Sequence, residues 1–110
     1  MKVYYSIEIR MHGTYEVEDR IMESASHMFG FSKKDIDEQD VHSVSVMFAS
    51  DLPPTEMRNR VAQFLVANHA VHYVDVIYRF EYAMVPDRFV RWRDGKIQEY
   101  TGYIDFREDV

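Results

Sequence analysis

The chain has 110 residues, of which 46% are hydrophobic and 15% aromatic, a composition typical of a globular protein. It contains no cysteine, which excludes disulfides, cysteine-ligated zinc and a cysteine nucleophile. The formal net charge of -6 opposes attraction of the whole surface to nucleic acid or to anionic lipid. The length fits one domain, and we predict a single α+β domain over residues 1–110.

The chain begins with a predicted strand over residues 2–12, followed by a predicted helix. Apolar residues alternate with polar ones through the strand, so one face is buried: Val3, Tyr5, Ile7, Ile9 and Met11. After Gly13 the apolar residues recur at helical spacing as far as Phe29. Thr14 is suited to cap the start of this helix and Gly30 to end it.

The stretch 31–40 is polar, and two interpretations of it stay open. Ser32 and Asp35 have the spacing of a capping box, which favours a short helix around Ile36; a solvated loop is the alternative. Residues 41–50 alternate as a second strand, with three residues facing the core: Val44, Val46 and Phe48. Prolines then open a second helix whose mostly apolar stripe contains Met57, Val61, Phe64, Leu65 and Asn68.

A third strand is predicted over residues 71–83, and a hairpin after it. The apolar face of the third strand contains Val74, Val76, Tyr78, Phe80 and Tyr82. Asp94-Gly95 lies between two β-rich runs and is the strongest short signal for a hairpin with a type I′ turn. Such a turn places Arg93 opposite Lys96, Trp92 opposite Ile97 and Arg91 opposite Gln98. The stretch 101–106 is expected to continue the last strand, with Gly102 as a candidate bulge.

These elements predict a two-layer α+β sandwich in the order β-α-β-α-β-β-β. Its sheet is expected to be mixed but rich in antiparallel pairs, with about five strands and both helices on one face. The order departs from the β-α-β-β-α-β order of ferredoxin-like folds.

Four side chains are weak candidates for a metal site: His42, His69, His72 and Asp75. Zinc accepts imidazole and carboxylate ligands, and three such ligands with an open position make a catalytic site. However, His69 ends a predicted helix and His72 begins a strand, so the two do not share one helix face. No nucleotide-binding glycine motif and no serine-nucleophile motif is present. We therefore expect no cofactor, name no catalytic residue, and favour binding over catalysis.

The hairpin and the polar faces of the strands carry the candidate binding residues: Tyr73, Ile77, Arg79, Arg91, Arg93, Lys96 and Tyr100. Tyrosine and arginine are enriched in the cores of protein interfaces. Tyr4 and Met47 are further apolar residues on otherwise polar strand faces. Basic residues beside aromatic ones also suit single-stranded nucleic acid, in which bases stack and phosphates pair with cations.

From these residues we predict a small binding protein that acts through an exposed sheet face and the hairpin over residues 88–100. The expected partner is another protein or a second copy, such as a homodimer. A single-stranded nucleic-acid-binding protein is the first alternative, and the acidic net charge disfavours it. A small metal-dependent enzyme with the histidine cluster is the second. The N-terminal stretch lacks the apolar run of a signal peptide, which favours a cytoplasmic protein without membrane association.

Overall fold

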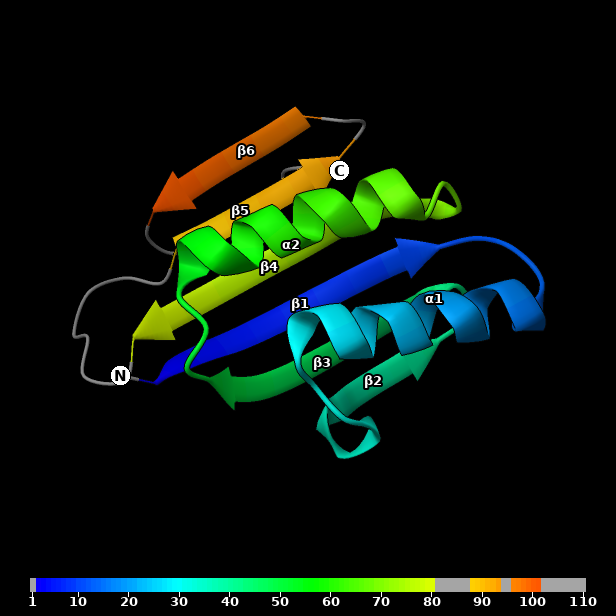
Figure 1. Ribbon diagram of the computed structural model, residues 1–110, viewed down its shortest axis with the longest axis horizontal. Coiled ribbons are helices and arrows are strands. Elements are labelled where there is room, and N and C mark those ends of the chain that lie inside the picture. Colours follow the sequence, from blue (N-terminus) through cyan, green and yellow to red (C-terminus); the bar gives the residue numbers. More distant parts are fainter. Residues whose placement is uncertain (1, 81–87, 94–95, 102–110) are drawn as a thin grey trace.

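The computed structural model describes the backbone of residues 2–80, 88–93 and 96–101, and the side chains up to Phe80. Its elements are β1 (Val3–Met11), α1 (Tyr15–Phe29), the 3-10 turn η1 (Lys33–Asp35), β2 (Ile36–Asp40), β3 (Ser43–Ser50), α2 (Pro54–Ala67), β4 (Val71–Phe80), β5 (Arg88–Arg93) and β6 (Lys96–Thr101). The six strands form one sheet in the order β2-β3-β1-β4-β5-β6, and every neighbouring pair is antiparallel. Both helices lie on the same face of this sheet (Figure 1).

The α+β class with two helices on one sheet face is confirmed, whereas the predicted element order, the five strands and the mixed sheet are wrong. Residues 36–40 form strand β2, where a short helix or a loop was expected. With β2 included, the elements up to β4 follow the order β-α-β-β-α-β. The order of their strands in the sheet, β2-β3-β1-β4, is the ferredoxin-like arrangement. The predicted order departed from that arrangement because it lacked β2; β5 and β6 extend the four-stranded core.

Strand β2 has almost no sequence signature, because it lies at an edge of the sheet. Ile36 is half-buried and the other residues of the strand are exposed, so no apolar alternation marks it. The capping box before it does form: the Ser32 N–H donates to Asp35 Oδ2 at 2.8 Å and holds η1. The strand itself is held by antiparallel pairing with β3, which includes a register shift between Ile36 and Glu38.

Both ends of α1 are capped as predicted. The Thr14 hydroxyl accepts a hydrogen bond from the Val17 N–H at 3.3 Å. At the other end, Gly30 has φ +84° and donates its N–H to the Ser26 carbonyl at 3.0 Å. A left-handed residue of this kind favours glycine, so the chain turns away from the helix at this position.

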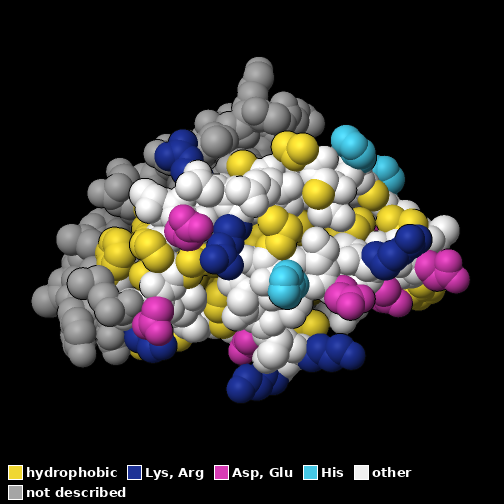
Figure 2. Space-filling model, in the orientation of Figure 1, with side chains coloured by type: hydrophobic (Ala, Val, Ile, Leu, Met, Phe, Trp, Pro, Cys, Tyr) yellow, Lys and Arg dark blue, Asp and Glu magenta, His cyan; other side chains and the backbone are white. Residues whose placement is uncertain are grey.

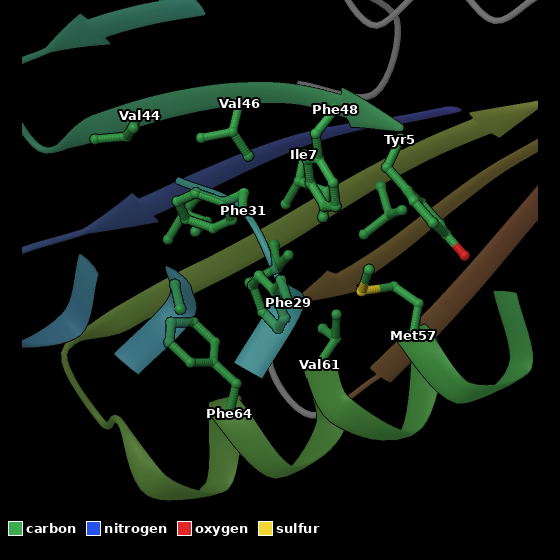
Figure 3. Packing of buried hydrophobic residues seen from close by; sticks show 14 of the residues in the cluster. Tyr5, Ile7, Phe29, Phe31, Val44, Val46, Phe48, Met57, Val61 and Phe64 are labelled. Carbon is green, nitrogen blue, oxygen red and sulfur yellow. The ribbon is translucent and has the colours of Figure 1, made fainter. Parts of the chain in front are cut away.

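The core lies between the sheet and the two helices (Figure 3). Phe29 of α1 and Phe64 of α2 pack edge to face, with 5.0 Å between the centroids of their rings. Ten of the strand residues predicted to face the core are buried: Val3, Tyr5, Ile7, Ile9, Met11, Val44, Val46, Phe48, Val74 and Val76. Of the remaining three, Tyr78 and Phe80 are partly buried against the core, and Tyr82 lies outside the described residues. Because side chains alternate along a strand, the intervening residues lie on the face that neither helix covers.

The register of the hairpin is confirmed in the described residues. Arg93 is opposite Lys96, Trp92 opposite Ile97 and Arg91 opposite Gln98. The predicted Asp94-Gly95 turn, the end of the third predicted strand at 81–83 and the continuation over 102–106 lie outside the described residues.

Candidate interaction surface

The sheet face opposite the helices, called the outer face below, is organised in four cross-strand rows. From β3 through β1 to β4, the rows are Ala49–Tyr4–Arg79, Met47–Ser6–Ile77, Ser45–Glu8–Asp75 and Ser43–Arg10–Tyr73. The backbone register continues the last three rows into the hairpin as Phe89–Tyr100, Arg91–Gln98 and Arg93–Lys96. The first two rows form an apolar end and the other two a polar end.

The apolar end contains a hollow of about 340 Å³. Its lining includes Tyr4, Ser6, Met47, Ala49, Ile77 and Arg79. The Arg79 guanidinium lies 4.6 Å from the centre of the Tyr4 ring, so the cation and the ring are already arranged against each other. Met47 of β3, just beyond the residues that pair with β2, remains 55% exposed. This end of the outer face therefore offers apolar surface next to a positioned cation.

The polar end is a network of paired groups. The Tyr73 hydroxyl donates a hydrogen bond to Glu8 Oε1 at 2.7 Å. Asp75 is directly opposite Glu8, and the next residue in the same row is Arg91 on β5. Asp75 is 8% exposed although no described helix or strand covers this face. Two carboxylates opposite each other repel unless a cation lies nearby, and the next residue of this row, Arg91, is basic.

Burial raises the pKa of Tyr73 to about 12, and the hydrogen bond to Glu8 and the nearby Glu8 and Asp75 charges act in the same direction. Arg10 acts in the opposite direction. The phenol therefore stays protonated at neutral pH and donates a hydrogen bond; it is not an activated base or nucleophile. This state suits a fixed polar surface better than a catalytic centre.

We expect Tyr73→Phe to lower the free energy of unfolding by about 1 kcal/mol near neutral pH, because the hydrogen bond to Glu8 is lost. The folded-state pKa is above the ordinary value of 10, so this stabilisation is complete below about pH 10 and disappears as the pH rises through about 12. Denaturant titrations at about pH 7 and pH 11 measure the difference. Tyr15→Phe, at a residue that is 87% exposed, is the control. If the difference in free energy of unfolding between wild type and Tyr73→Phe were the same at both pH values, the stabilising role of the Tyr73–Glu8 hydrogen bond would be contradicted.

The backbone register aligns all seven predicted binding residues with the rows of the outer face. Tyr73, Ile77 and Arg79 come from β4, and the remaining four are at the corresponding register positions of β5 and β6: Arg91, Arg93, Lys96 and Tyr100. The sequence did not include Tyr4, Met47 or Glu8 among the site residues. Their period-two positions were visible, but their neighbours became known only with the strand order.

The structure separates the metal candidates. His42, which has φ 65°, places Nδ1 2.5 Å from Glu18 Oε1. The ring of His72 lies against His12 at 4.3 Å between centroids, whereas Asp75 belongs to the polar end of the outer face. Within residues whose side chains are described, no three histidine, aspartate or glutamate side chains are grouped so that they could hold a metal ion. The four candidate residues therefore do not form a metal-binding group there.

The side of the molecule that carries the helices has a different character. Figure 2 shows basic and acidic side chains interspersed over α1 and α2, without a broad area of one sign. In the described part of the chain, neither helix combines the length and the apolar character needed to cross a membrane.

No protein-family model, curated protein or solved structure matches this chain. Its own residues are therefore the basis for interpreting the outer face.

Proposed function

We propose that the chain is a protein-binding domain whose contact surface is the outer face together with the hairpin over residues 88–100. The observation that carries the proposal is the apolar hollow beside the Tyr4–Arg79 pair, on a sheet face that no described helix covers. Tyrosine, methionine and arginine are enriched at the centres of protein interfaces, and all three surround this hollow.

The size of the outer face supports a protein partner. Strands rise about 3.3 Å per residue and lie about 4.8 Å apart, so the four rows, three of which extend across the hairpin, cover roughly 550 Å² in projection. The accessible area of a side-chain surface exceeds its projection, and a stable interface buries about 800 Å² per partner. A partner that covers all of these rows, including those of the hairpin, therefore reaches the ordinary size of an interface.

The polar end argues against nucleic acid as the first choice. Glu8 and Asp75 lie in the central strands, where the phosphates of a bound single strand would approach them. A protein partner can instead place donors and cations against these carboxylates while its apolar groups enter the hollow.

The test compares two double variants of similar composition. Tyr4→Ser with Ile77→Ser removes apolar contact from the outer face, whereas Tyr15→Ser with Val66→Ser replaces one tyrosine and one β-branched aliphatic residue of the helices that are 87% and 75% exposed. The wild-type chain is first used to identify a partner. That partner is then purified, and the Kd of its complex with each variant is measured. We expect the outer-face variant to bind at least about tenfold more weakly and the helix variant to bind as wild type does.

Equal affinity of the two variants would overturn the proposal. Single-stranded RNA or DNA is titrated in parallel at physiological salt. Micromolar or tighter binding that Arg91→Glu with Arg93→Glu abolishes would establish the nucleic-acid alternative instead.

A further inference from the structure

Strand β2 at one edge of the sheet is acidic, and the last two strands at the other edge are together basic, the edge strand β6 itself carrying Lys96 and Glu99. Strand β2, at one edge, contains Asp37, Glu38 and Asp40 and no basic residue. At the other edge, β5 and β6 together contain four basic residues and Glu99 as the one acidic residue: Arg88, Arg91, Arg93 and Lys96. In the described part of the chain, no strand pairs with the outer side of either edge.

The strand directions match between the two edges. All six strands alternate in direction, so β6 is antiparallel to β2 of the same chain. A second copy in the same orientation can therefore place its β2 beside β6 in an antiparallel pair. The helices of the two copies would then lie on the same side of one continuous sheet.

The cross-strand rows bring acid and base together in such a pair. The row that starts at Asp40 on β2 ends at Lys96 on β6, after passing Arg93. The row that starts at Glu38 ends at Gln98, next to Arg91. Continuing the register without an offset therefore places Lys96 beside Asp40 of the next copy. Opposite charges at facing positions of a strand pair stabilise it.

A hollow beside β2, on the helix side of the sheet, provides room for the side chains of an added strand that point towards the helices. It measures about 890 Å³, lies between α1 and β2, and is lined in part by Met22, Phe31, Ile36 and Val44. Ile97 of β6 is in the row of Trp92 and Val74, and Val74 is buried under the helices. An added β6 would therefore present the Ile97 position on the side of this hollow.

We propose that copies of this chain associate head to tail, with β6 of one copy adding to β2 of the next. The inference rests on the proposed function, because it names a second copy as the partner of the hairpin. Pairing of β2 with β2 gathers six carboxylates at one seam, which is how charged edges prevent association of like edges. A head-to-tail contact does not close on itself after two copies, so assemblies grow into rings or filaments.

The test is a charge exchange read by solution mass as a function of concentration at low salt. The first variant is Glu38→Lys with Asp40→Lys, the second is Arg93→Glu with Lys96→Glu, and the third combines all four changes. We expect the wild-type mass to rise with concentration and to fall towards the monomer, 13.2 kDa, as salt increases. The first two variants should stay at the monomer mass, and the combined variant should associate again because attraction is restored.

Three results would overturn the inference: a wild-type chain that is monomeric at every concentration, association that the β2 variant leaves unchanged, or a combined variant that does not recover. The second result would indicate pairing of β6 with β6 or contact through the outer face. Circular dichroism verifies that each variant is folded, and the salt dependence of the wild type tests the proposal without any substitution. Tyr4→Ser with Ile77→Ser distinguishes the two proposals, because it should weaken binding through the outer face at least about tenfold while leaving association through the edges unchanged.

Discussion

Replacing Phe64 with alanine is expected to lower the free energy of unfolding by about 3–5 kcal/mol. Phe64 is fully buried on α2, and its ring meets Phe29 of α1 edge to face (Figure 3). Truncation removes the contact between the helices and leaves a cavity that the rigid sheet cannot fill. The loss is a large fraction of the 5–15 kcal/mol by which domains are usually stable.

Denaturant unfolding at constant pH measures this effect, with Val66→Ala as the control. Val66 lies two residues away on the same helix but is 75% exposed, so its truncation should change stability by no more than about 0.5 kcal/mol. Similar losses for the two variants would show that α2 packs on the sheet through a different face.

The second large effect is expected for Tyr5→Phe, which should cost about 1–3 kcal/mol. Tyr5 is 2% exposed, and its hydroxyl donates a hydrogen bond to the Leu52 carbonyl at 2.5 Å. The substitution keeps the ring against Phe48 but leaves a carbonyl of the β3–α2 connection without this donor. The connection sets where α2 begins, so a single hydroxyl links β1 to the position of the second helix.

The alkaline limb of the stability curve provides an independent measurement. Burial, with a smaller contribution from the neighbouring Tyr78, raises the pKa of Tyr5 above its ordinary value. The stabilisation is therefore complete below about pH 10 and is lost as the pH rises further. Tyr15→Phe removes a hydroxyl from an exposed ring and is the matched control. A Tyr5→Phe variant as stable as Tyr15→Phe would contradict the role of this hydrogen bond.

Much of the fold could be predicted because burial imposes a period on the sequence. Ile7 and Ile9 alternate under the helices, while Ile21 and Ala25 recur at helical spacing, and each pattern predicted the correct element. The edge strand β2 escaped prediction for the same reason. Among its residues only Ile36 is even half-buried, so backbone pairing with β3 holds the strand without leaving an alternation in the sequence.

The candidate interaction surface could likewise be predicted only in part. That Tyr73, Ile77 and Arg79 share a face follows from their spacing along one strand. That Tyr4 stacks beneath Arg79 depends on β1 lying next to β4, and no periodicity encodes which strands are neighbours. The ring contact of His72 with His12 depends on the same pairing.

The central position of β1 also bears on how quickly the native state is reached. This strand comes first among the described elements, yet Val3 pairs with Ser50 on one side and with Phe80 on the other. Pairings between such distant residues must close long loops before any contact compensates for the lost entropy, which slows folding relative to helical proteins of similar size. During synthesis one backbone edge of β1 therefore stays unpaired until β4 has left the ribosome, and an apolar strand that is incompletely paired is the kind of segment that chaperones bind.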